Sequence, residues 1–350
     1  VQWRLPLAIL YPMTHIKNKP RSLFLIPENR FREIYNAEAI VQIAELTKND
    51  GQVYCAEDVL SQPEAFADVE IVFSGWGAPV LDEALLDALP ALKAFFYGAG
   101  SVRNFVTEAF WARGIILTSA YKANAVPVAD YTMASVIFAL KRAWTRCQRL
   151  KEGIAPDYRR KVQGVYHGSK VGVISLGAIG QLVCERLTNL DLDVFAYDPF
   201  AGDDLFESLN VTRVERLEDL FPMCDVVSLH APWLPQTENL VTGAMLESLP
   251  DRGTFINTSR GAIVDEPGML KALQARPDLF AVLDLLQNEK TYHSNPITAL
   301  PNVFMTPHVA GSQGHECHRM GALAVEECRR YLNGEPQVTP LTRETAERLA

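Results

Sequence analysis

From residue 171 onward, short apolar runs alternate with amphipathic stretches at regular intervals. Each run is apolar almost throughout, whereas a half-exposed strand would alternate between apolar and polar positions. Continuous runs of this kind are typical of parallel strands whose two faces are both covered by helices. The pattern predicts a doubly wound parallel sheet with six strands: VGVISL (171–176), DVFAYD (193–198), DVVSLH (225–230), GTFINTSR (253–260), LFAVLDLL (279–286) and NVFMTPH (302–308).

The first third of the chain shows a separate alternation of the same kind, and 350 residues are enough for two domains. The predicted fold is therefore α/β with two Rossmann-like domains. The larger is a doubly wound parallel sheet that binds a dinucleotide, and the smaller is a flavodoxin-like substrate domain. Strands of the smaller domain are predicted at LFLIP (23–27), GQVYC (51–55), EIVFSGWG (70–77), LKAFFYGAG (92–100) and GIILTSA (114–120).

Two helical patterns connect these domains. Residues 126–150 read as one long helix, with Pro127 near its start and Asp130 in its first turn. Residues 314–334 read as an amphipathic helix that returns to the first domain. We therefore assign 1–128 plus 312–350 to the substrate domain and 129–311 to the dinucleotide domain.

Charge and composition exclude several classes of partner. The net charge of −9 argues against nucleic acid or an anionic membrane surface as the main partner. The most apolar segment, ANAVPVADYTMASVIFAL, is interrupted by Pro127 and Asp130, so we expect no membrane span. The N-terminal VQWRLPLAILYPM lacks a charged leader region and an A-x-A cleavage site. We expect a cytoplasmic protein.

The cysteines and histidines do not predict a metal site. Six cysteines are scattered without a C-x-x-C pair, as expected for small core residues in a reducing compartment. The stretch HECH (315–318) places two histidines three positions apart, but no third ligand stands nearby. No metal is expected.

A glycine turn follows the strand at 171–176. The fingerprint G-x-G-x-x-G is met by Gly177 and Gly180, but Ser175 occupies the first glycine position. Gly177 would let the backbone approach a pyrophosphate, and Gly180 would let the following helix pack closely on the strand. A serine is compatible with this turn if its φ stays negative.

Asp198 ends the next strand, eighteen residues after Gly180. Its carboxylate would accept hydrogen bonds from the adenosine ribose hydroxyls and repel a 2′-phosphate, which favours NAD over NADP. The alternative is a turn residue before Pro199.

Three reactive side chains follow later strands and are expected at one sheet edge, because ligands bind beyond the carboxyl ends of parallel strands. Arg260 would hold a carboxylate and polarise a carbonyl. His308 would deliver a proton near neutral pH, and Glu289 would orient it. The alternatives are a capping arginine, a structural histidine and a solvated loop acid.

The motifs GVISLGAIG, HAPWLPQTENLV, INTSRGAIVDE, LDLLQNE and TPHVAG resemble the D-isomer-specific 2-hydroxyacid dehydrogenases in order and spacing. The resemblance implies the catalytic residues Arg260, Glu289 and His308, NAD as cofactor and a homodimer. It further implies cofactor contacts at Gly177, Ala178, Ile179, Gly180, Asp198, His230, Pro232, Thr258, Ser259, Asp284 (which would hold the nicotinamide carboxamide) and Gly311. Implied substrate contacts are Trp76, Gly98, Ala99, Gly100 and Arg260.

The sequence departs from the family pattern at three places. Ser175 replaces a glycine, Lys290 follows Glu289 where proline is usual, and Val102-Arg103 replace an Asp-Asn pair in the first domain.

The substrate implied by the resemblance is a small, unphosphorylated 2-oxo acid such as glyoxylate or hydroxypyruvate, or one with an apolar side chain. Formate dehydrogenases of the family carry glutamine at the Glu289 position, and phosphoglycerate dehydrogenases place arginines near a stretch that here reads SGWGAP. Two alternatives stay open. One is an NAD(H)-sensing regulatory or scaffold protein on the same fold, and the other is a related reaction such as phosphite oxidation.

Overall fold

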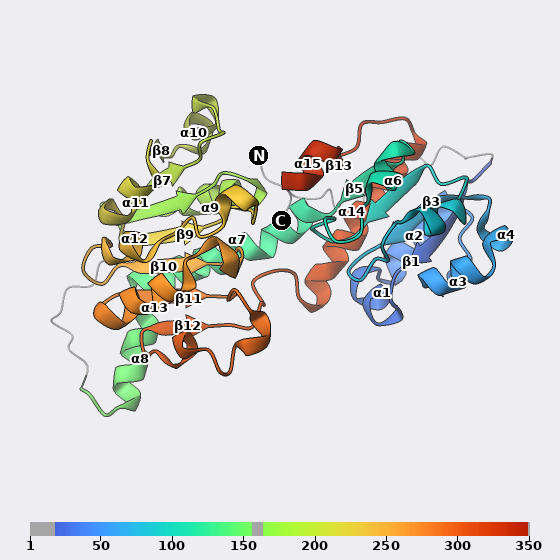
Figure 1. Ribbon diagram of the computed structural model, residues 1–350. Helices are drawn as coiled ribbons and strands as arrows, with labels where there is room; N and C mark the ends of the chain where they lie inside the picture. Colours follow the sequence, from blue (N-terminus) through green and yellow to red (C-terminus); the bar gives the residue numbers. More distant parts are fainter. Residues whose placement is uncertain (1–17, 156–163, 349–350) are drawn as a thin grey trace.

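The computed structural model describes residues 18–155 and 164–348. The N-terminal stretch VQWRLPLAILYPM considered above lies outside these residues. Two α/β units are visible in Figure 1, each built around one sheet and joined by the long helix α7 (Tyr121–Leu140). We call the unit around the six-stranded sheet the first unit and the unit around the seven-stranded sheet the second unit.

The second unit confirms the predicted doubly wound sheet. Its seven strands are all parallel, and their order is β12-β11-β10-β9-β6-β7-β8. Counted from β6, this is the Rossmann order with one further strand, and its switch point lies between β6 and β9. The strands are β6 (Lys170–Ile174), β7 (Asp193–Tyr197), β8 (Thr212–Arg213), β9 (Val226–Leu229), β10 (Thr254–Asn257), β11 (Phe280–Leu283) and β12 (Val303–Met305). Its α-helices are α9 (Ala178–Leu187), α10 (Asp203–Leu209), α11 (Leu217–Met223), α12 (Gly243–Glu247) and α13 (Glu266–Ala275), and its 3₁₀ turns are η1 (Pro235–Thr237), η2 (Gly261–Ile263), η3 (Glu289–Thr291) and η4 (Pro296–Ala299).

The first unit has the flavodoxin-like order that we predicted. Five parallel strands run β5-β4-β3-β1-β2, and a short antiparallel strand, β13, is added at the β5 edge. The strands are β1 (Arg21–Leu25), β2 (Val53–Tyr54), β3 (Val69–Ser74), β4 (Ala94–Tyr97), β5 (Ile116–Ser119) and β13 (Pro340–Leu341). The helices are α1 (Glu28–Ile34), α2 (Ala37–Leu46), α3 (Ala56–Ser61), α4 (Pro63–Phe66), α5 (Glu83–Asp87), α6 (Glu108–Ala112), the 3₁₀ turn η5 (Gly314–Cys317), α14 (His318–Leu332) and α15 (Arg343–Arg348).

Apolar runs form these strands because their side chains are buried on both faces. All four residues of β9, β10 and β11 are buried, as are all four of β4. Several helices begin at a residue whose side chain accepts a bond from a first-turn N–H, which satisfies a donor that the helix itself leaves free. These residues are Asn36, Asp82, Thr107, Thr242 and Asp265.

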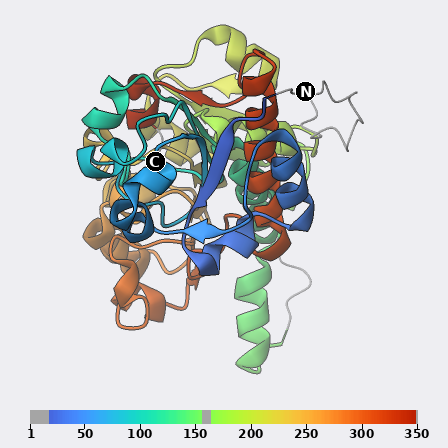
Figure 2. The ribbon, with the colours of Figure 1, turned by 90° about the vertical axis from the view of Figure 1, so that its right-hand side faces the viewer.

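The single helix predicted over 126–150 is wrong. The chain forms α7 and a second helix, α8 (Ala143–Lys151), separated at Arg142, whose φ is 52°. The left-handed backbone at Arg142 turns the chain, and α8 projects from the body in both views (Figures 1 and 2). Trp144 holds the base of α8 by stacking on Phe280 and Phe304, at ring-centroid distances of 5.7 and 4.9 Å.

Pro127 and Asp130 lie inside α7, which begins at Tyr121, five residues before the predicted start. Within the described ranges, α7 is the one helix long and apolar enough to cross a membrane by length and composition. Of its apolar 18-residue stretch, 56% is buried inside the molecule, where it packs on α9, α14 and the strands β9 and β10. A core helix of a globular unit has these same properties.

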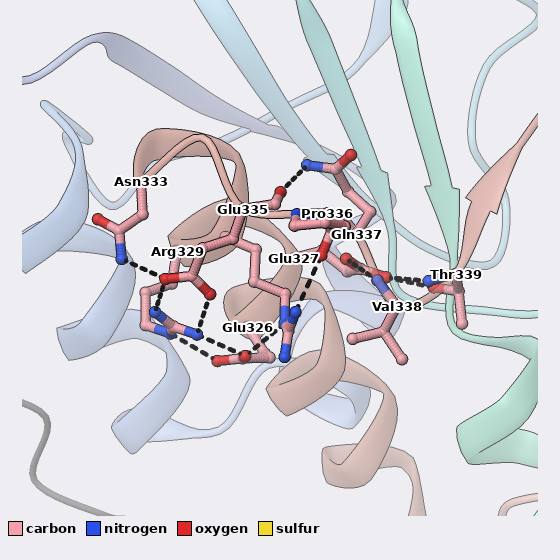
Figure 3. A network of polar contacts seen from close by, with 10 residues as sticks. Glu326, Glu327, Arg329, Asn333, Glu335, Pro336, Gln337, Val338 and Thr339 are labelled. Carbon is pink, nitrogen blue, oxygen red and sulfur yellow. Dashed lines mark hydrogen bonds and ion pairs between the residues drawn. The ribbon is translucent and has the colours of Figure 1, made fainter.

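Helix α14 returns to the first unit as predicted, where Ala324, Val325 and Cys328 join the core beside β4. It is followed by a segment tied down by charged side chains (Figure 3). Glu327 is almost fully buried and accepts bonds from Val338 N at 2.9 Å, from Thr339 N at 2.6 Å and from Thr339 Oγ1 at 2.5 Å. These bonds hold the chain in place to form β13.

Candidate functional site

The predicted reactive residues follow three adjacent strands of the second unit. Arg260 comes after β10, Glu289 after β11 and His308 after β12, and these strands are neighbours in the order β12-β11-β10. All three strands are parallel, so their carboxyl ends share one sheet edge.

His308 and Glu289 are in direct contact, with 3.0 Å between Nδ1 and Oε2. Their side chains are 44% and 43% exposed, so the pair is open to solvent. Glu289 begins the 3₁₀ turn η3, and Lys290 in the usual proline position does not prevent the contact. With Nδ1 directed at the carboxylate, Nε2 is the ring nitrogen available to a substrate.

Asp284 organises the backbone around His308. It is almost fully buried, and its Oδ1 accepts bonds from Thr306 Oγ1 at 2.6 Å and from Val309 N at 2.9 Å. Its Oδ2 accepts from Ala310 N at 2.9 Å, and its carbonyl oxygen accepts from His308 N at 2.9 Å. His308 has a φ of 55°, a left-handed conformation that costs a non-glycine residue about 1 kcal/mol. The bonds to Asp284 on both sides of His308 stabilise this conformation.

Arg260 is held through its own loop. Asn257 is buried at the end of β10, where Oδ1 accepts from Ser259 N at 2.9 Å and Nδ2 donates to Arg260 O at 3.1 Å. Arg260 Nη1 donates to Ser259 O at 2.7 Å. Burial lowers the pKa of the Arg260 guanidinium and the nearby Glu289 carboxylate raises it. The guanidinium of arginine stays charged near neutral pH, so a fixed cation lies near the His308–Glu289 pair.

Gly261 brings the Arg260 loop against the segment that leads to Glu289. A Cβ at Gly261 would lie 2.0 Å from the carbonyl carbon of Leu286 and 2.2 Å from Gln287 N. Glycine is therefore required at this position. On the far side, Gln287 N donates to Glu266 Oε2 at 2.7 Å, so this segment is fixed from both directions.

In the glycine turn, Ser175 has a positive φ, whereas we expected that a serine would fit only with a negative φ. Ser175 has a φ of 76°, so that expectation is wrong. Hydrogen bonds stabilise this backbone, because Ser175 N donates to Tyr197 O at 2.8 Å and Leu176 N donates to Asp198 Oδ2 at 2.7 Å. A Cβ at Gly180 would lie 1.9 Å from Ser175 O, which gives the close helix–strand approach that we predicted.

The turn leaves room for a ligand at the N-terminus of α9. A Cβ at Gly177 would meet no described atom within 4 Å. Gly177 is the N-cap of α9, and the N–H groups of Ala178, Ile179 and Gly180 lie in its first turn, where a helix supplies no acceptors. An open backbone at a helix N-terminus suits a pyrophosphate.

Asp198 accepts hydrogen bonds from backbone N–H groups of two loops, in addition to lying where a ligand would bind. Oδ1 accepts from Phe200 N at 2.8 Å and Ala201 N at 3.1 Å, which makes Asp198 the organiser of the turn after β7. Oδ2 accepts from Leu176 N and, at 3.4 Å, from Ser175 Oγ. Asp198 therefore stabilises the turn after β7 and also lies beside the glycine turn, where a ribose would bind.

His230 carries an unpaired buried nitrogen near the same edge. Its Nε2 lies 2.9 Å from Ser228 Oγ, whereas its Nδ1 is buried without a hydrogen-bond partner. Burial lowers the pKa of His230 to about 3, so the ring is neutral at neutral pH. An open glycine turn, a helix N-terminus and an orphaned polar atom at one sheet edge fit a bound dinucleotide.

The remaining predicted cofactor contacts lie in the same loops. Thr258 and Ser259 are buried after β10, and Ser259 Oγ donates to Leu229 O at 2.9 Å. Pro232 is half-buried, and its carbonyl accepts from Thr237 Oγ1 at 2.6 Å. Gly311 lies in the loop that follows His308.

The predicted substrate contacts of the first unit follow β3 and β4. Gly98 is required, since a Cβ would lie 2.8 Å from Ile34 Cγ2, whereas Gly100 is open on that side. Ser119 Oγ fixes the loop by donating to Ala99 O at 2.8 Å and Gly100 O at 2.5 Å.

Trp76 is half-buried at the end of β3. The Arg30 guanidinium lies 5.9 Å from the centre of the Trp76 ring. The stretch SGWGAP contains no charged residue, but the fold places this cation beside it. Arg30 is paired with Glu33 at 2.7 Å. Its charge is therefore balanced.

Val102 and Arg103, which replace the Asp-Asn pair, have different roles. Val102 is buried in the core of the first unit. Arg103 is exposed, and its Nη1 donates to the carbonyl oxygen of Trp233, 2.6 Å away in the second unit. The departure therefore creates a contact between the two units.

Sequence reasoning missed the residues that support the site, namely Asn257, Thr306, Ser119 and Glu266. Their signal was weak, because each acts by binding backbone atoms of a loop whose path the sequence does not give. Over the described ranges, no group of three His, Cys, Asp or Glu is placed to hold a metal ion.

Residues 133–310 match the profile described as "D-isomer specific 2-hydroxyacid dehydrogenase, NAD binding domain". The glyoxylate/hydroxypyruvate reductase B of Klebsiella pneumoniae is 30% identical over 284 residues, which cover 79% of this chain and 86% of the relative. The D-3-phosphoglycerate dehydrogenase of Methanocaldococcus jannaschii is 28% identical over 270 residues, which cover 77% of this chain and 50% of the relative. The chain thus spans about half the length of the phosphoglycerate dehydrogenases that it matches.

Solved structures show the same fold. A phosphoglycerate oxidoreductase from Rhizobium etli superposes with a TM-score of 0.79 at 19% identity, covering 93% of this chain and 99% of the other. At this identity the likeness concerns the fold alone. The family profile covers half of this chain, and the Klebsiella relative is matched over most of its length. The chain therefore belongs to the D-isomer-specific 2-hydroxyacid dehydrogenase family, and its second unit is the NAD-binding domain of that family.

Proposed function

We propose that the protein reduces a small, unphosphorylated 2-oxo acid to the D-2-hydroxy acid, or catalyses the reverse oxidation, with NAD(H). One observation carries this proposal. The imidazole of His308 is paired with Glu289 at 3.0 Å, near the half-buried Arg260 on the adjacent strand end. Membership of a 2-hydroxyacid dehydrogenase family supports it.

In the direction of reduction, Arg260 binds the substrate carboxylate and polarises the adjacent carbonyl with its fixed fork of donors. His308 delivers a proton from Nε2 to the carbonyl oxygen, as a general acid. Glu289 stabilises the charged imidazole through Nδ1. When bound, NADH would supply the hydride to the carbonyl carbon, and NAD⁺ would accept it in the reverse direction. In the oxidation, His308 takes the hydroxyl proton instead.

The N–H groups at the start of α9 and the open backbone at Gly177 would hold the pyrophosphate. Asp198 would accept hydrogen bonds from the ribose hydroxyls at Oδ2, in place of the long contact of 3.4 Å from Ser175 Oγ. The same carboxylate disfavours a 2′-phosphate, which supports NAD over NADP. We also propose that Asp284 receives the carboxamide in addition to holding the His308 loop.

The first unit supplies the side of the site that selects the substrate. The backbone at Gly98, Ala99 and Gly100 would receive the carboxylate, and Trp76 would limit the side chain. The Arg30–Glu33 pair leaves no net cation for a phosphate there. The Klebsiella relative is named a glyoxylate/hydroxypyruvate reductase, which supports a small substrate.

Neither alternative is favoured. An NAD(H)-sensing protein would not require the His308–Glu289 pair beside Arg260. Phosphite oxidation uses the same fold, but no observation on the substrate side supports it over a 2-oxo acid.

We further propose a homodimer formed through the second unit. Helix α8 has no buried residue, and apolar side chains are exposed along and beside it at Phe138, Leu150, Ile154 and Tyr166. A second copy covering these side chains would remove them from water. Six unpaired cysteines support a reducing, cytoplasmic setting.

We retain the division into residues 1–128 plus 312–350 and residues 129–311 as a proposal. Its first boundary lies inside α7, so one helix would belong to both units.

The direct test is oxidation of NADH in the presence of a panel of 2-oxo acids that includes glyoxylate, hydroxypyruvate, phenylpyruvate and phosphohydroxypyruvate. We expect turnover with at least one unphosphorylated acid and slower turnover with NADPH. Turnover with the phosphorylated acid alone would contradict the substrate class. NADH binding without turnover on the whole panel would favour the sensing protein.

A further inference from the structure

The loop 306–312 carries His308, and helix α7 contacts both ends of this loop. At the first end, Tyr131 Oη lies 2.8 Å from Thr306 Oγ1. At the other end, Ser312 N donates to Asn124 Oδ1 at 2.9 Å. Tyr131 and Asn124 are seven positions apart, or about two helical turns, so both lie on one side of α7. This side of α7 therefore spans the whole loop from 306 to 312.

The direction of the first contact follows from the groups present. Thr306 Oγ1 has one hydrogen, and at 2.6 Å from Asp284 Oδ1 it donates that hydrogen to the carboxylate. Tyr131 must then be the donor to Thr306. The resulting chain runs Tyr131 to Thr306 to Asp284, and each bond polarises the next.

Asp284, held by Thr306, in turn fixes the backbone around His308. It receives Val309 N and Ala310 N on its carboxylate and His308 N on its carbonyl oxygen. His308 itself has a left-handed backbone, with a φ of 55°. A backbone in this region keeps its geometry only where its surroundings fix it.

The same helix also reaches the arginine loop. Thr132 is fully buried on α7, and its Oγ1 lies 3.3 Å from Thr258 Oγ1, two residues before Arg260. Helix α7 starts directly after β5 of the first unit and packs on α9 of the second. Helix α7 joins the two units (Figure 1), and its side chains contact both reactive loops.

We propose that Tyr131 and Asn124 are positioning residues that set the orientation of His308 by holding both ends of the 306–312 loop from α7. The proposal rests on the proposed function for its kinetic consequence, but its structural consequence is independent of substrate. Neither residue touches the reacting atoms.

The kinetic test uses Tyr131→Phe, which removes only the hydroxyl, with Tyr121→Phe as the matched control. Tyr121 lies on the same helix and its hydroxyl makes no hydrogen bond within residues 18–155 and 164–348. We expect Tyr131→Phe to lower kcat about tenfold and to change the KM for NADH less than twofold. Tyr121→Phe should match the parent protein.

Two further sets of variants identify the route. In the Thr306→Val background, Tyr131→Phe should cause no additional loss of kcat, because the chain to Asp284 is already broken. Asn124→Ala should also lower kcat, and Asn124→Asp should restore it by keeping the acceptor for Ser312 N. Additive losses from the two changes at 131 and 306 would contradict the proposed route.

A spectroscopic readout separates this proposal from the proposed function. In protein with ¹³C-labelled histidine, the His308 ring signal is identified by its loss in His308→Gln. We expect that signal to move in Tyr131→Phe and Asn124→Ala but not in Tyr121→Phe, whether or not a 2-oxo acid is turned over. An unmoved signal together with unchanged kcat would overturn the proposal. A moved signal in a protein inactive on every acid would support it while contradicting the proposed function.

Discussion

Arg103 and Trp233 are 130 positions apart in the chain, yet Arg103 Nη1 donates to the Trp233 carbonyl oxygen at 2.6 Å. The arginine follows β4 in the first unit, and the tryptophan follows β9 in the second. Arg103 also lies three residues after Gly100, in the loop proposed to receive the substrate carboxylate. The contact therefore ties that loop to the second unit.

Arg103→Ala should weaken substrate binding without affecting the cofactor. One exposed hydrogen bond is worth about 1 kcal/mol, so we expect the KM for the 2-oxo acid to rise about fivefold. The dissociation constant of NADH should not change. Arg32→Ala is the control, because it removes the same charge from an exposed site on α1. Equal KM values for the two variants would contradict a role for the contact.

Ser175 should tolerate glycine but not a β-branched residue. Its φ of 76° suits glycine, whereas valine is strongly disfavoured in this region. We expect Ser175→Gly to bind NADH within threefold of the parent protein and Ser175→Val to bind about tenfold more weakly or worse. Quenching of tryptophan fluorescence by NADH measures both. Tight binding by the valine variant would mean that the turn does not position the cofactor.

His230 should make the protein less stable as the pH falls. Its pKa is lowered to about 3 by burial, while the unfolded chain has an ordinary value near 6.5. Between these values the unfolded state binds one more proton, so the free energy of unfolding falls with pH by up to about 1.4 kcal/mol per pH unit. This contribution is absent in His230→Gln.

Urea unfolding at pH 7, 6 and 5 checks this prediction. The parent protein should lose stability more steeply than His230→Gln, because the carboxylates contribute equally to both. Parallel curves would show that His230 is protonated in the folded protein.

Glu327 should matter for stability far more than its neighbour Glu326 (Figure 3). The buried Glu327 accepts three bonds from the segment at 338–339, and Glu327→Gln leaves at least one of these donors poorly matched. We expect a loss of about 2–3 kcal/mol in the free energy of unfolding. Glu326 makes partly exposed ion pairs with Arg329 and Arg330, and Glu326→Gln should cost about 1 kcal/mol or less. Equal losses would contradict the distinction.

The sequence was sufficient for the two sheets and for placing the three residues that we propose react at one sheet edge. Continuous apolar runs identified eleven strands because both faces of each sheet are covered, and burial then leaves a clear signal. The strand-end rule located Arg260, Glu289 and His308, because adjacent parallel strands bring distant residues to one edge. The strands β8 and β13 were missed because each has two residues and neither lies in a continuous apolar run.

Local backbone geometry was not predictable in the same way. Nothing in the apolar pattern marks the positive φ of Arg142, which separates α7 from α8, or the positive φ of Ser175. The conformation of Ser175 depends on contacts with a segment further along the chain, for example the bond from Leu176 N to Asp198. The contacts of Tyr131 and Asn124 with the His308 loop span 175 and 188 positions. A single sequence carries no signal for such pairs.

The central claim is that His308 is the proton donor of the reaction. His308→Gln keeps a polar side chain of similar size but cannot deliver a proton near neutral pH. With a 2-oxo acid that the parent protein reduces, we predict that kcat falls about 10²–10⁴-fold while the dissociation constant of NADH stays within threefold. A variant that retains kcat within threefold of the parent protein would contradict the account.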